Sequence, residues 1–432
     1  MSIRTTRALR AAAAPRGGAR ALAAGSAAGG NASGGDAGSA DDVAAALEEG
    51  GSLTVWAWEP TLEQVVSDFE AEYPNVDVEL VNAGTGNDQY TALQNAIAAG
   101  KGVPDVAQVE YYALPQFALS DAVADLSSFG ADELDGTFTP GPWNAVQQGE
   151  GIYGLPMDSG PMALFYNEEV FTQHGIEVPT TWDGFVEAAR ALHAADPNVY
   201  ITNDTGDAGF TTSLIWQAGG QPFQVDGTDV TIDLADEGST QFAQTWQTLI
   251  DEDLLAPVSS WSDEWYQGLG NGTLATLALG AWMPAHLGAG VTDGAGKWRV
   301  APLPQWEEGA SASAENGGSA LSVPAASSNQ ALAYGFLEYA NAGDGVQTRV
   351  DGGAFPAATA ELESDDFQGF ESEYFGGQKI NEVLAQSASD VVEGWSYLPF
   401  QVYAIWSFTA PVGLGYVSGS YLGDRRRGGP AG

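Results

Sequence analysis

The chain has 432 residues, of which 44% are hydrophobic and 10% aromatic, so it can build one large domain or two of ordinary size. It contains no cysteine, which excludes disulfides, thiolate metal sites and cysteine nucleophiles. Fourteen basic residues against 57 acidic ones give a formal net charge of −43, and so acidic a surface repels nucleic-acid phosphates and anionic lipid headgroups.

The basic residues are concentrated at the two ends of the chain. Five arginines lie in the first 20 residues and three more at 425–427, which leaves six basic residues between positions 21 and 424. Salt adaptation or solubility at a crowded cell surface also explains such acidity, so the charge alone indicates no ligand. The three histidines, His174, His193 and His286, have no metal-binding spacing, so we expect no metal and no cofactor.

The first 51 residues have the character of an export region followed by a linker. The beginning of the chain is rich in arginine and free of acidic residues, like a signal peptide, but Pro15 and nearby glycines interrupt the apolar stretch that should follow. Leu22-Ala23-Ala24-Gly25 is similar to a lipoprotein cleavage box, with Gly25 in the place of the lipidated cysteine. We expect 1–51 to be a degenerate signal region with a flexible linker, and 416–432 to be a disordered tail.

Regular structure is expected from about Ser52 onward. Leu53–Trp58 is apolar and lies between a glycine and a proline, which predicts a buried strand. Thr61 and Gln64 have the spacing of a capping box, and the residues from 62 onward have the apolar periodicity of a helix. Because alternate residues of a strand face opposite sides, we assign Trp56 to the core.

The next segments continue the alternation of strands and helices. The pattern predicts a strand at 76–80, a helix at 90–97 that ends near Gly100, and a strand at 106–109. This order is typical of an α/β domain with a largely parallel sheet. A second α/β series follows from about 152, with strands at 162–166, 274–282 and 298–300, a helix that Thr180-Thr181 caps, and a helix at 242–250.

Several segments, in the same order along the chain, resemble the family-1 extracellular solute-binding proteins, relatives of maltose-binding protein. The resemblance covers about 52–410 and includes aromatic, glycine and proline positions in both halves of the chain. Its segments are 52–73, Gly102-Val103-Pro104-Asp105-Val106, Tyr153-Gly154-Leu155-Pro156, Leu164-Phe165-Tyr166-Asn167, Pro179-Thr180-Thr181-Trp182, Ala218-Gly219-Gly220, Leu279-Gly280-Ala281-Trp282, 314–319 and Gly352-Gly353-Ala354-Phe355-Pro356.

The resemblance implies a particular fold. It is the α/β, two-lobed flytrap of the type II periplasmic-binding-protein class, in which the chain crosses between the lobes three times. The crossings would lie near 158–160, 314–315 and 352–353. Lobe 1 would comprise 52–158 with 315–351, and lobe 2 would comprise 160–314 with 353–415.

The resemblance also implies a sugar ligand, and the residues give an independent reason for one. Aromatic rings cover the flat C–H faces of a sugar, while carboxylates and amides bind its hydroxyls. The chain has 13 tryptophans, more than a core needs. Strand ends and loops supply the candidate ligand contacts, which are Trp58, Glu59, Glu110, Tyr111, Asp158, Trp282, Asn316 and Trp395.

The function that follows is binding of a short oligosaccharide and its delivery to the permease of an ABC importer, without catalysis. Such a protein would be a monomer outside the cytoplasm, normally anchored as a lipoprotein, although the anchor cysteine is absent here. A binder of a cationic molecule such as a polyamine is an alternative, since the chain is acidic. A glycoside hydrolase is a further alternative, because carboxylates and aromatic residues also form such active sites.

Overall fold

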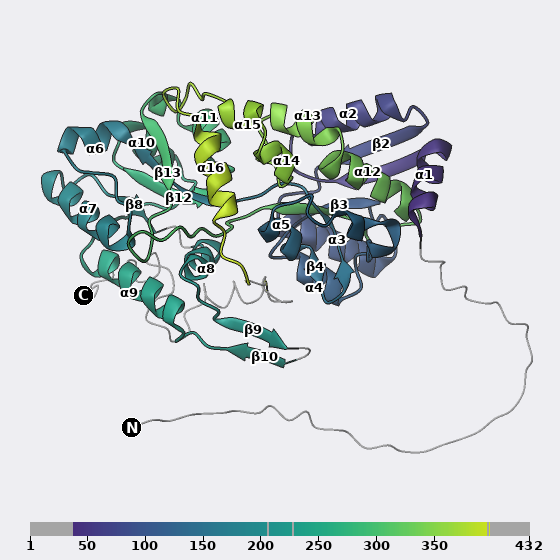
Figure 1. The fold of residues 1–432 in the computed structure, drawn as a ribbon, viewed down its shortest axis with the longest axis horizontal. Coiled ribbons are helices and arrows are strands. Elements are labelled where there is room, and N and C mark those ends of the chain that lie inside the picture. The colour runs from purple at the N-terminus through teal and green to yellow at the C-terminus, as the bar shows by residue number, and fades with distance from the viewer. Residues whose placement is uncertain (1–37, 205–206, 227–228, 395–396, 398–432) are drawn as a thin grey trace, which may run out of the picture. The chain divides into compact units, whose positions relative to one another are not determined.

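Two hydrophobic cores lie within the described part of the chain, each beside its own sheet (Figure 1). The computed structural model describes residues 38–204, 207–226, 229–394 and 397, so the expectations for 1–37, Trp395 and 416–432 lie outside it. One core draws on 43–157 and on 320–358, and we call the body around it lobe 1. The other draws on 162–314 and on 355–388, and we call the body around it lobe 2.

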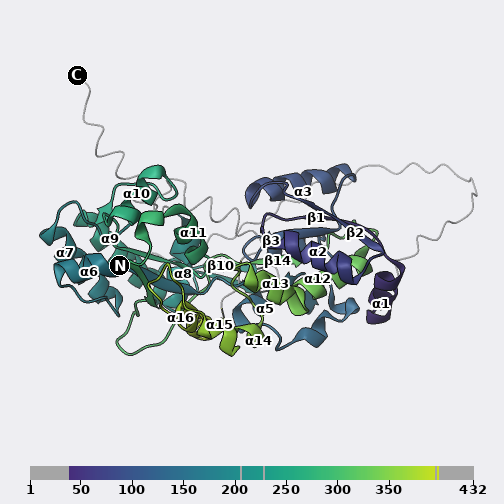
Figure 2. The same ribbon diagram turned by 90° about the horizontal axis from the view of Figure 1, so that it is seen from above.

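Lobe 1 is built on a five-stranded sheet in the order β2-β1-β3-β14-β6. β1 (Gly51–Trp56) is parallel to β2 (Val76–Val81) and to β3 (Val106–Glu110), whereas β14 (Ser319–Ser322) is antiparallel to β3 and to β6 (Leu155–Pro156). Figure 2 shows the sheet between α3 (Asn87–Ala99) on one side and α2 (Leu62–Glu72), α12 (Gln330–Ala342) and α13 (Gly345–Asp351) on the other.

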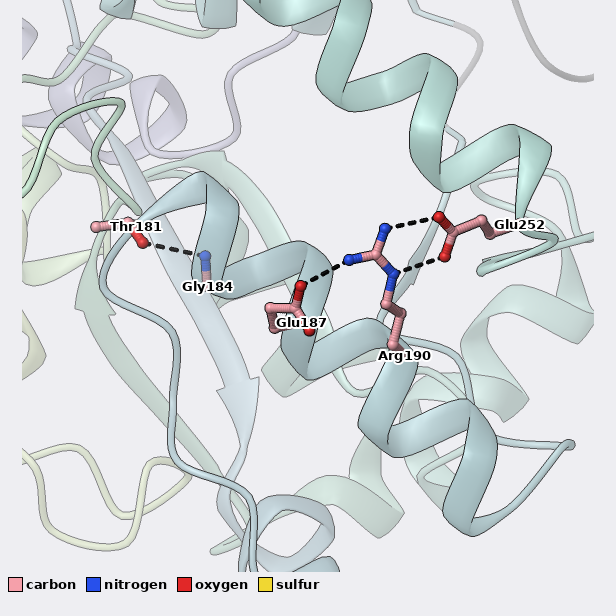
Figure 3. A network of polar contacts seen from close by, with 5 residues as sticks. All are labelled: Thr181, Gly184, Glu187, Arg190 and Glu252. Atoms are coloured by element: carbon pink, nitrogen blue, oxygen red, sulfur yellow. Dashed lines mark hydrogen bonds and ion pairs between the residues drawn. The ribbon is translucent and has the colours of Figure 1, made fainter.

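Lobe 2 is built on a three-stranded antiparallel sheet in which β7 (Met162–Asn167) lies between β12 (Thr276–Gly280) and β13 (Trp298–Pro302). Helix α7 (Trp182–Ala195) begins where the sequence predicts, because the Thr181 side chain accepts a hydrogen bond of 3.0 Å from the Gly184 amide (Figure 3). Arg190 of the same helix forms ion pairs with Glu187 and with Glu252, which ends α9 (Glu237–Asp251) (Figure 3).

The remaining elements are short or lie around these two sheets. No helix of the described residues is long and apolar enough to span a bilayer. The further elements are α4 (Leu114–Leu119), η1 (Ser127–Phe129), η2 (Ala131–Leu134), α5 (Pro140–Ala145), β4 (Gln147–Gln148), β5 (Gly151–Ile152), α6 (Glu168–His174), β8 (Thr202–Asn203), α8 (Ala208–Gln217), β9 (Phe223–Asp226), β10 (Asp229–Ile232), β11 (Leu255–Ala256), α10 (Asp263–Asn271), α11 (Met283–Gly290), η3 (Thr292–Gly294), α14 (Thr359–Leu362), α15 (Asp365–Gly369) and α16 (Ile380–Ser389).

The structure corrects the predicted linker, since its last part is a helix. Residues Ala40–Glu49 form α1, which packs against α12 and buries Val43 in the core of lobe 1. The helix begins with a capping box, in which the Ser39 hydroxyl accepts from the Asp42 amide and the Asp42 carboxylate accepts from the Ser39 amide. The linker was predicted because alanine, serine and glycine are frequent there, yet alanine is also the best helix former.

One local prediction in lobe 1 is also wrong, and a second holds only in part, since Trp56 packs against the lobe 1 core without being fully buried. Thr61 makes no capping hydrogen bond through its side chain, and it donates instead, from its amide and its hydroxyl, to the carboxylate of Glu59. The fully buried residues at the end of β1 are Val55 and Ala57, whereas Trp56 lies on the other side of the strand and is only half-buried. The alternation was right, but it was applied from the wrong residue.

Candidate functional site

The loop after β1 is held at the end of the lobe 1 sheet by one buried amide. Gln108 of β3 is 1% exposed, and its Oε1 accepts hydrogen bonds of 3.0 Å and 3.1 Å from the amides of Trp58 and Glu59. Its Nε2 donates to the Ser319 hydroxyl of β14 at 3.1 Å. A buried amide with partners on both of its atoms is costly to move, so it fixes where Trp58 and Glu59 lie.

Glu110, the last residue of β3, lies among tyrosine hydroxyls. The Tyr90 hydroxyl donates to Oε2 of Glu110 at 2.9 Å and accepts from the Glu110 amide at the same distance. Burial raises the pKa of Glu110 to about 7, the hydrogen bonds from Tyr90 and Tyr112 oppose the rise, and the charges of Asp158 and Asp207 add to it. Asp207 belongs to lobe 2, so the charges that act on Glu110 come from both lobes.

Asp158 lies where the chain leaves lobe 1. Its Oδ1 accepts a hydrogen bond of 2.5 Å from the Ser319 amide. Burial raises the pKa of Asp158 to about 6, and the charge of Glu59 adds to this rise. The Arg349 guanidinium and the hydrogen bond from Ser319 lower the pKa and so oppose the rise. The residue as a whole is half-buried.

Tyr111 has a structural role in place of the ligand contact that the sequence analysis expects. It is 1% exposed, and its hydroxyl donates to the backbone oxygen of Asp158 at 2.6 Å. Its ring lies against Gly318, where a Cβ atom would come within 2.6 Å of the ring. The residue follows a strand end, as predicted, but strand alternation turns its side chain into the lobe 1 core.

Glu315 and Arg349 are two buried charges beside Asp158. The Glu315 carboxylate accepts from the Gly160 amide at 2.6 Å and from the Ser159 hydroxyl at 3.0 Å. Burial raises its pKa to about 7. Arg349 is 2% exposed, and its Nη1 donates to the backbone oxygen of Met157 at 2.5 Å. The Glu315 bonds hold the connecting segments 157–160 and 315–319 together, and Arg349 ties the first of them to α13.

Lobe 2 contributes a group of aromatic rings, which we call the aromatic wall and define as Trp261, Trp265, Tyr266, Trp282 and His286. Trp282 follows β12, is half-buried, and donates from Nε1 to the backbone oxygen of Asn316 at 2.7 Å. Its ring lies 5.9 Å from that of Trp261, centroid to centroid, at an angle of 30°. Asn316 is buried, and its Nδ2 is 3.4 Å from the Ser213 hydroxyl.

A small cavity of about 50 Å³, which we call the tryptophan pocket, lies in lobe 2 beside the aromatic wall. It brings together Trp282 and Asn316, two of the predicted contacts, with residues that the sequence analysis did not single out. Its lining consists of Phe185, Thr202, Asn203, Asp207, Phe210, Trp246, Ser260, Trp261, Trp265, Leu277, Ala278, Leu279, Trp282 and Asn316.

The described part of the chain also lines two further cavities. The first has a volume of about 210 Å³. It is lined by Pro115 and Asn144 of lobe 1 on one side and by Trp216 and Tyr397 on the other. The larger, of about 600 Å³, lies beside the β9–β10 hairpin of lobe 2 and contains none of the predicted contacts. No group of three or more histidine, aspartate or glutamate residues within the described ranges is arranged to hold a metal ion.

Among the site residues that the sequence analysis missed, Trp261 and Asp207 were missed for different reasons. Trp261 stands among Ser259, Ser260, Ser262 and acidic residues, and an aromatic residue in such polar surroundings could have been recognised as exposed. Asp207 caps α8, accepting from the Gly209 amide at 2.8 Å, and nothing in the sequence indicates that it lies opposite Glu110.

Comparison with known proteins gives the same family along most of the chain. Residues 56–345 match the model of the family described as bacterial extracellular solute-binding protein. A curated relative, the arabinooligosaccharide-binding protein of Halalkalibacterium halodurans, is 27% identical over 311 residues, which are 69% of this chain and 68% of that protein.

Two solved structures are also similar. The first is the ABC transporter associated binding protein of B. animalis subsp. lactis in complex with β-1,6-galactobiose, with 44% identity, a TM-score of 0.75, and coverage of 87% of this chain and 96% of that one. The second is the galacto-N-biose-/lacto-N-biose I-binding protein of the ABC transporter from Bifidobacterium longum, in complex with lacto-N-biose. It has 27% identity, a TM-score of 0.73, and coverage of 83% and 90%.

Proposed function

The chain belongs to the family of bacterial extracellular solute-binding proteins, and on this basis we propose that it binds a short oligosaccharide between its lobes and delivers it to an ABC-type importer. Its fold is the α/β fold of periplasmic binding proteins, and members of the family bind solutes without catalysing a reaction. The observation that carries the proposal is the aromatic wall of lobe 2 together with the carboxylates of lobe 1.

This combination suits the chemistry of a sugar. A tryptophan ring covers the C–H face of a pyranose, and a carboxylate accepts hydrogen bonds from adjacent hydroxyls. Trp282 would supply the ring in lobe 2, and the acids of lobe 1 would accept from the hydroxyls. The proposed contacts are Trp58, Glu59, Glu110, Asp158, Trp282 and Asn316, together with Trp395, which lies outside the described residues.

We propose the three-crossing arrangement of the lobes as well, with lobe 1 at 52–158 and 315–351 and lobe 2 at 160–314 and 353–415. Contacts among the connecting segments support it. The Asn316 amide donates to the Gly160 oxygen at 2.8 Å, and the Ser159 amide donates to the Phe355 oxygen at 3.3 Å. Gly353, at the third proposed crossing, has a φ of 94°, which a glycine adopts without strain.

The relatives narrow the class of ligand. The structure with 44% identity holds a disaccharide of two hexoses, and the second holds lacto-N-biose. We propose a disaccharide or short oligosaccharide for this chain, with galactobiose-type and arabinooligosaccharide-type sugars as the first candidates. It would act as a monomer outside the cytoplasm, and the closed form would dock on the permease subunits.

The experiment is a thermal-shift and calorimetric screen of the full chain against β-1,6-galactobiose, lactose, arabinobiose, maltose and xylobiose. A sugar at 100 times its Kd should add about 2.7 kcal/mol of stability. We expect one series to raise the melting temperature and to be recovered uncleaved, as chromatography will show. A folded protein that no sugar stabilises, or one that cleaves the sugar, would contradict the proposal.

A cationic ligand is the second candidate, because Glu59, Glu110, Asp158 and Asp207 influence one another electrostatically at the site. Spermidine in the same screen tests it. The affinity of a polycation should fall steeply between 50 and 500 mM salt, whereas that of a neutral sugar should stay nearly constant. Binding of spermidine with such a salt dependence, and of no sugar, would replace the first candidate with this one.

A further inference from the structure

Arg349 is a buried charge to which no described residue supplies an ion pair. It belongs to α13 and is 2% exposed, and a guanidinium keeps its charge in the interior of a protein. Its Nε and Nη2 are buried and have no hydrogen-bond acceptor among the described residues, and the ion pairs found in that part of the chain do not include Arg349. An unpaired charge in the interior is costly, so stability alone does not explain this arginine.

The guanidinium is fixed beside the segment that leads to Asp158. Its Nη1 donates to the backbone oxygen of Met157 at 2.5 Å and to Oδ1 of Asn341 at 3.2 Å. Asn341 is itself buried, and its Nδ2 donates to the backbone oxygen of Leu155 at 3.0 Å. The hydrogen bonds of Arg349 therefore hold the chain at the residue immediately before Asp158.

Asp158 is held on its other sides by neutral groups. The Ser319 amide donates to its Oδ1 at 2.5 Å, and the Tyr111 hydroxyl donates to its backbone oxygen at 2.6 Å. These bonds determine where the carboxylate lies, but neither of them supplies a positive charge. The charge that favours the ionised carboxylate comes from Arg349.

The other charged groups around Asp158 act in the opposite direction. Burial and the charge of Glu59 raise the pKa of Asp158, whereas the guanidinium of Arg349 lowers it. Glu110 and Glu315 are further carboxylates whose charges interact with that of Asp158. Without Arg349, the low-dielectric surroundings and all three carboxylates would favour the protonated form of Asp158.

On the premise of the proposed function, in which Asp158 contacts the sugar, we propose that Arg349 is a positioning residue that holds Asp158 in place and in its ionised form. Arg349 lines none of the three cavities, so it acts on the ligand only through Asp158. An ionised carboxylate accepts hydrogen bonds from sugar hydroxyls on both oxygens, whereas a protonated one also has to donate. The buried arginine thus extends the pH range in which Asp158 binds sugar downward.

The first test measures the affinity for β-1,6-galactobiose between pH 5 and pH 8.5 by calorimetry. In wild type, affinity should fall as the pH falls through the titration of Asp158. Arg349→Met keeps the length of the side chain but removes its charge, so the midpoint of this fall should move up by about one pH unit or more. Arg349→Lys keeps the charge and should stay close to the wild-type midpoint. A purely structural arginine would instead lower the affinity by the same factor at every pH in both variants.

Three further variants separate the effect on Asp158 from other effects. Arg190→Met is the matched control, because Arg190 forms its ion pairs within lobe 2, and it should leave the profile unchanged. Since Glu110 titrates in the same range, Arg349→Met is also made in an Asp158→Asn background, where it should shift the midpoint no further. If Arg349→Met does not fold, Asn341→Asp replaces it. This variant places a carboxylate on Nη1, neutralises the guanidinium and should also move the midpoint up.

The second test needs no sugar. In protein with ¹³C-labelled aspartate, the carboxyl signal of Asp158 is identified by its loss in Asp158→Asn, and its NMR titration should move to higher pH in Arg349→Met or Asn341→Asp. If this titration does not move, or if it moves while the pH profile of sugar affinity does not, the inference is wrong. If wild type binds no sugar at all, the proposed function fails, and a moved titration then shows only that Arg349 controls the charge of Asp158.

Discussion

Replacing Glu315 with glutamine tests what a buried carboxylate beside the connecting segments does to stability. Glu315 is 3% exposed, and burial raises its pKa from 4.5 to about 7, although hydrogen bonds from Gly160 and Ser159 oppose the rise. Between these two pH values the folded protein keeps a proton that the unfolded chain has released. Because the folded state then binds more protons, the free energy of unfolding falls as the pH rises through this window.

The magnitude follows from the same two pKa values. Each pKa unit corresponds to about 1.4 kcal/mol, so ionised Glu315 costs the folded state about 3 kcal/mol once the pH is above 7. Part of this loss has already occurred at pH 5. Between pH 5 and pH 8, the contribution of Glu315 to the free energy of unfolding should fall by about 2 to 3 kcal/mol.

The assay is urea unfolding of wild type and Glu315→Gln at pH 5, 6, 7 and 8. Glu110 and Asp158 also have raised pKa values and are present in both proteins. Because the charge of Asp158 acts on Glu315, the difference between the two curves reports Glu315 together with its coupling to Asp158. The stability of the variant relative to wild type should increase by about 2 to 3 kcal/mol over this range. The exposed control Glu63→Gln should follow wild type. Parallel curves for Glu315→Gln and wild type would refute this reasoning.

Three further predictions concern binding and stability. The pKa values of Glu110 and Asp158 are raised to about 7 and 6, and protonation removes hydrogen-bond acceptors from both carboxylates. Sugar affinity should therefore rise from pH 5.5 to pH 7.5. Calorimetry that shows a constant affinity would count against a role of these two residues in binding. Trp282→Ala should weaken sugar binding about tenfold or more in a tryptophan-fluorescence titration. The control is Phe370→Ala, which should bind sugar like wild type because Phe370 is an exposed aromatic residue outside the three cavities. Thr181→Ala should lower the free energy of unfolding by about 1 kcal/mol, since it leaves the Gly184 amide without its capping partner. Unchanged urea unfolding would show that this cap does not contribute to stability.

The sequence predicted the elements whose signals are local. β1, α2, β2, α3 and β3 lie where apolar periodicity indicated them, and the Gly100 cap of α3 has the expected left-handed conformation, with a φ of 60°. The helix at Ala40–Glu49 was missed because its apolar face is narrow and its alanines and serine are also typical of linkers. Packing against α12, which follows about 290 residues later in the chain, decides that this segment folds.

For the site, the sequence indicated which loops end near one another but not which side chains face the solvent. Tyr111 and Glu110 are adjacent in sequence, yet one is buried under the Asp158 segment and the other lies between tyrosine hydroxyls opposite Asp207. No local pattern contains this distinction, because it depends on contacts between distant segments.

Composition and periodicity by themselves determined that this is an α/β chain without cysteine chemistry, acidic and rich in tryptophan. Only the tertiary structure decided which tryptophans form core and which form a surface, since Trp265 is 1% exposed and Trp261, four residues earlier, is 49% exposed. The physical reason is that burial and pKa depend on all neighbours within a few ångströms, and at the site these neighbours come from both lobes.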